Sequence, residues 1–369
     1  MKKGARFAGE GVWRTDSATG ARLRQVTASD ALSHPAYFLH SSFLVGDKQI
    51  FFTSYRSGPP QLFLAEYPDG EILQLTGGAP IHPFSALLAP QAEEIIFTRG
   101  SEIWALKLSS LAERRIFSLG EGQLGECSIS SGGEWLTAAF QSNEGRGLAV
   151  GRTDGTQWRL IPFPRTVIHP QFHPLEPEWI EFSADPAPRM HRVRRDGKGL
   201  ECLYEHSNDE FVVHETFLGS TGDLVFTVWP RLVARLDWTT RCITTIAEFN
   251  AWHIAPNRAG TQILCDTNHP DLGLHLIDAA TGARRLICLS LASNQGSQWA
   301  KSSYALAEDF AAARSQAGGS GVLSWMEAPA DTVYGPQWTH PHPSWSSDES
   351  KVAFASDRTG VTQVYVVEL

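Results

Sequence analysis

The stretch that decides the fold is PSWSSDESKVAFASDRTGVTQVYVVEL, which runs from Pro343 to Leu369. It holds a short apolar first segment, a polar turn, a strongly apolar strand at Val352–Phe354, a second turn of sequence Asp-Arg-Thr-Gly, and a further strand, QVYVVEL. Units of about four short strands that repeat roughly every 40 residues are typical of the blades of a β-propeller. The stretch therefore predicts one blade.

The same pattern recurs along the chain. Its apolar second strand is expected at Ile50–Thr53, Ile95–Thr98, Trp135–Ala138, Trp179–Phe182, Leu224–Val228, Ile263–Cys265 and Val352–Phe354. Seven such strands predict an all-β fold, a single seven-bladed β-propeller domain that spans residues 1–369. One interruption, SYALAEDFAAARSQAGGSG at 303–321, reads as a short helix inserted before the last blade.

The two ends of the chain are expected to meet in the last blade. The final unit stops after its third strand, whereas the N-terminal segment DSATGARLRQVT (Asp16–Thr27) resembles the turn and fourth strand DAATGARRLICL (Asp278–Leu289). An N-terminal strand that completes the last blade would close the ring. It would also cover a sheet edge that could otherwise pair with other chains.

Composition limits the classes of function. The chain carries 31 Lys and Arg against 40 Asp and Glu, a net charge of −9, so no basic surface for nucleic acid is expected. No segment approaches the roughly 18 consecutive apolar residues of a membrane span, and the N-terminus lacks the apolar core of a signal peptide. We therefore expect a cytoplasmic protein, and its scattered cysteines predict reduced thiols.

Histidine recurs at one position of the repeat. Ten residues before the apolar second strand, the seven units carry His40, Ser85, Glu126, His169, His214, His253 and His342. Five of these seven are histidine, although the chain holds only 13 histidines. Because the innermost strands of all blades line the central channel, equivalent positions are expected to lie at one height and to face a common centre.

A metal site is predicted where three of the histidines should converge. His340 and His342 stand two apart in QWTHPHPSW (337–345), so both rings face one side of an extended strand. With His253 and the amide oxygen of Gln337, they would offer three nitrogens and one oxygen to a divalent ion, with positions left open for substrate. Hydrogen-bonded core histidines are the alternative, but clustered imidazoles would repel one another on protonation.

Other channel residues are weaker candidates. His34, His40 and His169 could contact a ligand in the same channel, or could be packing residues whose rings bond the backbone. His269 lies on a predicted turn and could reach a ligand or nothing. Arg189 follows the second strand of the fourth blade, and the sequence alone does not distinguish a surface position from a site.

At these residues the chain resembles the oligogalacturonate lyases. The resemblance covers essentially the whole chain and is strongest in RQVTASDALSHPAYF (24–38), IHPQFHP (168–174), VVHETF (212–217), WHIAPNRAG (252–260) and QWTHPHPSWSSDESKVAFASDRTG (337–360). It implies a seven-bladed propeller that splits short pectin-derived uronides by β-elimination. The expected partner is then a small anionic oligosaccharide.

The resemblance also implies roles for individual residues. Manganese, or another divalent metal, would be bound by His253, His340, His342 and Gln337. His214, in VVHETF, would be the catalytic base. Arg189 would neutralise a uronate carboxylate or assist departure of the leaving oxygen.

One segment departs from the family pattern. Oligogalacturonate lyases commonly carry a Cys-His-Glu-Gly run after the strand of blade four, whereas this chain has FSADPAPRM (182–190), with Ala184 in place of the histidine. The reaction class is therefore a safer expectation than the sugar. A binding or scaffolding propeller and a hydrolase or epimerase with the same metal centre are the alternatives.

Overall fold

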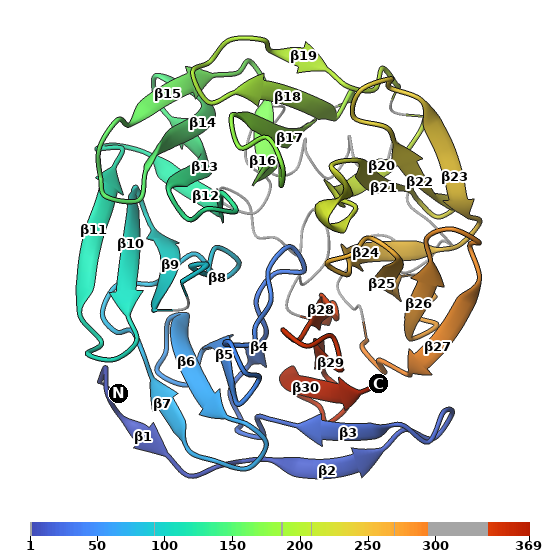
Figure 1. Ribbon diagram of the computed structural model, residues 1–369. Helices are drawn as coiled ribbons and strands as arrows, with labels where there is room; N and C mark the ends of the chain where they lie inside the picture. The colour runs from blue at the N-terminus through green and yellow to red at the C-terminus, as the bar shows by residue number, and fades with distance from the viewer. Residues whose placement is uncertain (1, 92, 186, 208, 269, 294–338) are drawn as a thin grey trace.

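The structure is a computed structural model that describes residues 2–91, 93–185, 187–207, 209–268, 270–293 and 339–369. Seven sheets stand side by side in a ring around a central channel (Figure 1). Within these residues the only helix is a single 3-10 turn, Gly219–Thr221. The predicted fold class, an all-β seven-bladed propeller, is confirmed.

The blades are numbered here in chain order, and the strands of each run from the channel outward. Blade one has β4 (Ser33–His34), β5 (Gln49–Ser54), β6 (Gln61–Glu66) and β7 (Ile72–Gln74). Blade two has β8 (Leu87–Leu88), β9 (Glu94–Arg99), β10 (Glu102–Lys107) and β11 (Glu113–Ser118). Blade three has β12 (Gln123–Ile129), β13 (Trp135–Ser142), β14 (Gly145–Arg152) and β15 (Arg159–Pro162). Blade four has β16 (Thr166–Phe172), β17 (Trp179–Asp185), β18 (Met190–Arg194) and β19 (Glu201–Cys202).

The remaining blades follow the same order. Blade five has β20 (Val212–Phe217), β21 (Leu224–Val228), β22 (Leu232–Leu236) and β23 (Ile243–Ala247). Blade six has β24 (Ala251–Pro256), β25 (Gln262–Thr267), β26 (Leu274–Asp278) and β27 (Arg284–Cys288). Blade seven begins with β28 (Ser344–Trp345), β29 (Lys351–Ser356) and β30 (Gln363–Glu368).

The N-terminal segment joins two blades. Its first strand, β1 (Arg6–Phe7), pairs with the outer strand of blade one, and its next two, β2 (Val12–Thr15) and β3 (Arg22–Gln25), lie outside β30 in blade seven. Leu23 stands opposite Val367 in that pairing. Blade seven, where the sequence analysis expected the chain ends to meet, thus contains strands from both (Figure 1).

The apolar core lies between neighbouring sheets. All seven predicted second strands fall within the observed ones, β5, β9, β13, β17, β21, β25 and β29. One cluster joins Leu264 of blade six to Phe354 and Tyr365 of blade seven and to Leu23 from the N-terminal segment. Burial of each such side chain contributes about 1.5–3 kcal/mol, so neighbouring blades hold each other in place.

The innermost strands carry an irregularity at a recurrent place. Their pairing with the second strand shifts register in blades three to six, between Leu124 and Cys127, Ile168 and Gln171, Val213 and Thr216, and Ala251 and Ile254. These gaps contain Glu126, His169, His214 and His253, which are positions that the repeat singled out. A β-bulge re-aims side chains, so the local fold explains why the repeat presents them to the channel.

Three histidines at these positions have an unusual backbone. His169, His214 and His342 adopt left-handed φ angles of 53°, 58° and 45°. Such angles are uncommon for residues other than glycine and persist only where the surrounding structure enforces them, often at functional sites. For His169 and His214 the bulge therefore fixes the direction of the ring at some cost in backbone energy.

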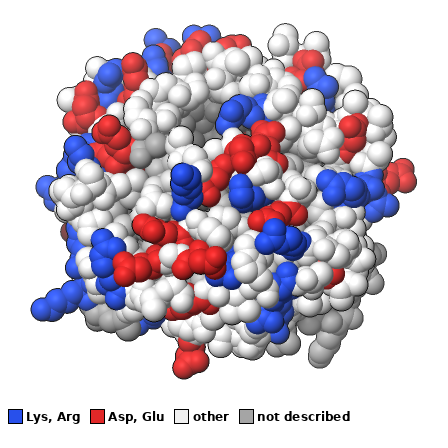
Figure 2. All heavy atoms as spheres, turned by 60° about the horizontal axis from the view of Figure 1, so that its bottom comes forward, with Lys and Arg blue, Asp and Glu red and all other residues white. Residues whose placement is uncertain are grey.

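The outer surface carries acidic and basic side chains interspersed, as Figure 2 shows for one face. Among the described residues, no helix has the length and apolar character needed to cross a bilayer. The predicted helix at 303–321 lies outside the described residues.

Candidate metal centre and active site

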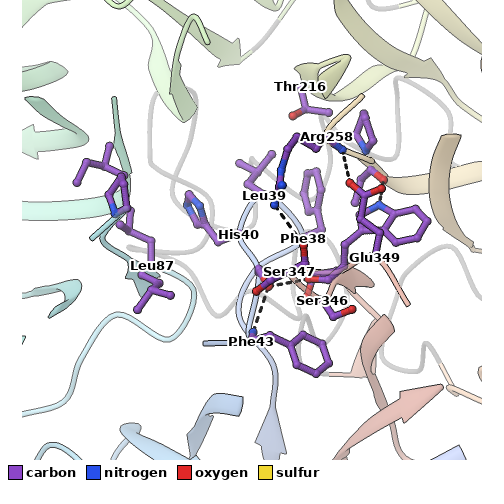
Figure 3. Close-up of a pocket in the computed structure, with 18 of the residues that line it drawn as sticks. Phe38, Leu39, His40, Phe43, Leu87, Thr216, Arg258, Ser346, Ser347 and Glu349 are labelled. Atoms are coloured by element: carbon purple, nitrogen blue, oxygen red, sulfur yellow. Dashed lines mark hydrogen bonds between the residues drawn. The ribbon is translucent and has the colours of Figure 1, made fainter. Parts of the chain in front are cut away.

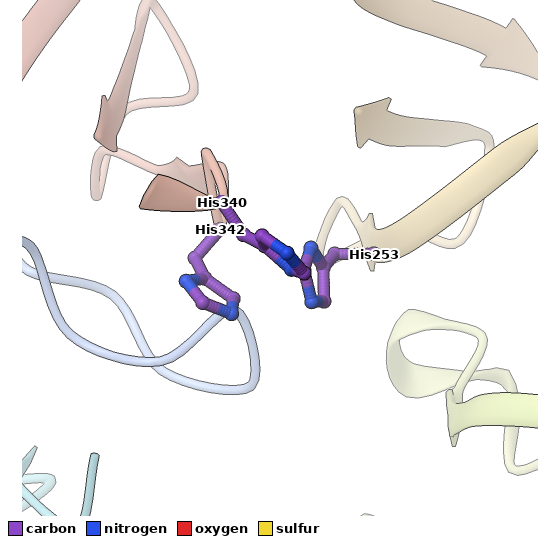
Figure 4. Close-up of side chains that lie close together, drawn as sticks. All are labelled: His253, His340 and His342. Carbon is purple, nitrogen blue, oxygen red and sulfur yellow. The ribbon is translucent and has the colours of Figure 1, made fainter. Parts of the chain in front are cut away.

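Three buried histidines from two blades come together at the channel, as the sequence predicted. Ligand-capable atoms of His253, His340 and His342 all lie within 4.8 Å of one another (Figure 4). The ring centroids of His253 and His342 are 4.1 Å apart, and those of His253 and His340 are 5.6 Å apart. Three imidazole nitrogens at such spacing can bind one divalent ion.

The donor set fits a metal in a second respect. Both ring nitrogens of His342 are buried and make no hydrogen bond within the described part of the chain. Burial and the neighbouring His253 ring hold the pKa of His342 well below its usual range. A neutral, buried imidazole that lacks a hydrogen-bond partner has the form in which histidine binds metals.

A carboxylate behind the cluster orients its central ligand. Asp266, in β25, accepts hydrogen bonds of 2.7 Å from both the backbone N–H and the ring Nδ1 of His253. It also accepts one of 3.3 Å from the backbone N–H of His342. Metal-binding histidines usually donate their second ring nitrogen to such a partner, which fixes the tautomer. Nε2 of His253 is thereby left for an ion.

Removal of this carboxylate should weaken metal binding. We expect Asp266→Asn to lower the affinity for a divalent metal about 10–100-fold, because the His253 ring loses the carboxyl group that orients it. Titration calorimetry with manganese would measure the change. Asp271→Asn is the control, since Asp271 is another acid of blade six, half-buried, that accepts a hydrogen bond from Ser290 instead. Unchanged affinity in Asp266→Asn would refute the orienting role.

His214 stands next to the metal set. It is buried on β20, and its ring centroid lies 4.4 Å from that of His253 and 4.5 Å from that of Trp252. Burial and the neighbouring His253 and His169 rings hold the pKa of His214 well below its usual range. The ring is therefore neutral near pH 7 and able to accept a proton, which is the state that a general base requires.

Arg189 is a buried, paired residue and does not lie on the surface. Its Nε donates to Oε1 of Glu215 over 2.9 Å, and Ser183 donates to the other carboxylate oxygen over 2.6 Å. Burial raises the pKa of Glu215, but the Arg189 guanidinium outweighs this effect and holds that pKa well below its usual range. This ion pair lies directly behind His214, because Glu215 follows it in β20.

A loop of blade one enters the channel and brings two rings to the site (Figures 1 and 4). The Tyr37 hydroxyl lies 2.9 Å from Nε2 of His169, and the Tyr37 ring centroid lies 5.0 Å from that of His342. The Phe38 ring lies 5.3 Å from His214. Neither aromatic residue stands at the recurrent position of the repeat. Their place in the stretch that resembles the oligogalacturonate lyases was the only signal.

His34 and His40 have separate environments. His34 is buried, stacks on Phe84 with centroids 4.7 Å apart, and bonds the carbonyl of Pro35. His40 bonds the carbonyl of Cys127 over 3.0 Å and lines a cavity of about 580 Å³ with Phe38, Leu87 and Arg258 (Figure 3). Burial lowers the pKa of both rings to about 4, so both are neutral.

His40 reaches the channel from a loop rather than from a bulge, and it lines a cavity there with inner residues of other blades. In blade one the inner strand pairs at His34 with Thr53 and again at Phe43 with Ile50. Residues 35–42 therefore form a loop where blades three to six have a short bulge. Tyr37 and Phe38, rather than His40, lie against the central histidines. Gln337 and His269 lie outside the described residues, and their predicted roles stay predictions.

Comparison with known proteins was made by sequence and by fold, and no family model matches the chain. The oligogalacturonide lyase of Pectobacterium atrosepticum is 20% identical over 393 residues, which cover 96% of this chain and 95% of that protein. The oligogalacturonate lyase of Dickeya dadantii is also 20% identical, with the same coverage.

Solved structures agree with the sequence comparison. An oligogalacturonate lyase in complex with manganese superposes with a TM-score of 0.81 at 18% identity, over 100% of this chain and 98% of that one. The oligogalacturonate lyase of Vibrio parahaemolyticus gives a TM-score of 0.79 at 18% identity, over 99% and 98%. The chain is thus similar from end to end to oligogalacturonate lyases in sequence, and it shares the propeller fold of the solved ones.

Proposed function

We propose that the protein is a metal-dependent lyase that cleaves short uronic-acid oligosaccharides by β-elimination and leaves a 4,5-unsaturated uronide. The observation that carries this proposal is a neutral, buried His214 beside three convergent histidines. Two relatives that match the chain from end to end are named as oligogalacturonide or oligogalacturonate lyases, which supports an oligogalacturonide as substrate.

Manganese is the proposed metal, because the similar structure with a TM-score of 0.81 is of an oligogalacturonate lyase in complex with manganese. His253, His340 and His342 would hold it, with Gln337 as the proposed fourth ligand. When bound, such an ion acts as a Lewis acid on the uronate carboxylate, an effect of several kcal/mol. Other divalent ions suit the same donor set.

The residues of the chain then have distinct tasks. The proton on C5 of a uronide lies next to the carboxylate and is weakly acidic, so its removal needs a positioned base. His214 takes that proton, the C5–H electron pair becomes the C4=C5 double bond, and the C4–O4 pair leaves with the oxygen. No water is consumed.

Further residues would bind the substrate. Arg189, which Glu215 holds in place, is proposed to neutralise a uronate carboxylate or to assist departure of the leaving oxygen. His34, His169 and His269 remain proposed substrate contacts. His40 remains a proposed contact for a substrate long enough to reach the cavity that it lines.

A direct assay tests the reaction. Digalacturonate and trigalacturonate incubated with the protein and manganese should produce the near-ultraviolet absorbance of a conjugated alkene. New reducing ends without that absorbance would indicate a hydrolase, and a stereochemical change alone would indicate an epimerase. A protein that takes up no stoichiometric metal and leaves every uronide intact would support a scaffold instead.

A further inference from the structure

Channel-facing residues of five successive blades form an arc. Oε1 of Glu126 lies 3.9 Å from Nε2 of His169, at one end. The ring centroids then follow at 6.2 Å from His169 to His214, 4.4 Å from His214 to His253, and 4.1 Å from His253 to His342. The candidate base thus stands between the metal-binding histidines and the Glu126–His169 pair.

The order of groups along this arc matches the order of atoms in the reaction. In a uronide the carboxyl carbon is bonded to C5, and C5 is bonded to C4, which carries the leaving oxygen. Suppose that the uronate carboxylate binds at His253 and His342 and that its C5 proton points to His214. C4 and its oxygen then lie against the next position along the arc. That position belongs to His169 and Glu126.

Glu126 has the properties of an acid held in its protonated form. Its side chain is buried, and within the described residues Oε1 makes no hydrogen bond. Burial raises the pKa of Glu126 to about 8, whereas that of Glu215 is lowered by its Arg189 partner. A carboxylic acid that its surroundings keep protonated near pH 7 can donate its proton.

We propose that Glu126 is the proton donor to the leaving oxygen of the β-elimination. This inference rests on the proposed function. As the C4–O4 bond breaks, its electron pair stays on O4, and the Glu126 carboxyl proton forms the new O–H bond. Glu126 is left as a carboxylate and His214 as an imidazolium. Transfer of one proton from His214 to Glu126, along the side where His169 lies, restores both groups.

Two other residues near the arc are less suited to this step. The Tyr37 hydroxyl already shares a hydrogen bond with His169. Arg189 directs its Nε to Glu215, and a guanidinium holds its protons too firmly to release one near pH 7. Glu126 has neither restriction.

The test compares two leaving groups. With a sugar as the leaving group, Glu126→Gln should lower kcat about 10²–10⁴-fold, the usual contribution of a general acid, while KM, metal content and melting temperature stay close to wild type. With a synthetic galacturonate that carries a nitrophenyl ether at C4, the loss should be under about tenfold, because a nitrophenolate leaves without a proton. His214→Ala should lose turnover of both substrates, since both reactions remove the C5 proton.

The possible outcomes are distinct. Equal losses on the two substrates would overturn the donor role and leave Glu126 a structural part of the channel. Tyr37→Phe, made in parallel, would take over the assignment if it alone showed the leaving-group dependence. Wild-type protein that forms no alkene from either substrate would overturn the proposed function itself, which separates that failure from a failure of the Glu126 assignment.

Discussion

Replacement of His214 by alanine is expected to lower turnover of an oligogalacturonide about 10²–10⁴-fold, the range that a positioned general base contributes, while the protein keeps its metal. The ring is neutral and lies 4.4 Å from His253, yet it does not belong to the histidine group that can bind an ion. Alkene absorbance would measure turnover, and elemental analysis of the dialysed protein would measure metal content.

Substitution of a metal-binding histidine should have a different effect from that of His214→Ala. His342→Ala should lose both the metal and the activity, because two histidines and the proposed Gln337 amide hold a divalent ion less firmly than the full set. Equal metal loss in the His214 and His342 variants would contradict the separate roles. Full activity of His214→Ala would exclude it as the base.

Deletion of residues 1–27 should prevent the protein from folding stably. The deletion removes β1, β2 and β3 from blades one and seven, and with them Leu23, which is fully buried in the cluster between blades six and seven. Loss of one buried leucine side chain costs about 2–5 kcal/mol, and whole domains are stable by only about 5–15 kcal/mol. Thermal unfolding followed by circular dichroism would measure the effect.

Two point variants distinguish the loss of buried side-chain packing from the loss of the N-terminal strands. Leu23→Ala should lower the unfolding free energy by about 2–5 kcal/mol, whereas Val12→Ala on the exposed strand β2 should change it by less than about 0.5 kcal/mol. A truncated protein that melts like the full-length chain would show that the other strands of blade seven suffice.

The propeller could be predicted because its repeat is local. Each blade places a polar turn, an apolar strand and a second turn at fixed spacing, so the second strands were found to within a few residues. The bulge of the inner strand also recurs at fixed distance, which is why counting ten residues back reached Glu126, His169, His214 and His253. In blade one the count reached His40, because the loop at 35–42 replaces the bulge.

The supporting residues of the site could not be predicted, because their contacts join distant parts of the chain. Asp266 belongs to blade six but accepts a hydrogen bond from His342 of blade seven. Glu215 follows His214 in the sequence, and nothing in that sequence indicates that it pairs with Arg189 of blade four. A lone acid in an otherwise apolar strand was the available signal for Asp266, and its meaning depends on partners that only the fold brings near.

The shared blade also sets the order of events during synthesis. Strand β3 is synthesised well before its partner β30, because the first six blades lie between them in the chain. Pairing of such widely separated segments is slow, so the early strands wait while the other blades assemble. Chaperones that shield exposed strand edges on the nascent chain should therefore matter more for this protein than for one whose terminal strands pair locally.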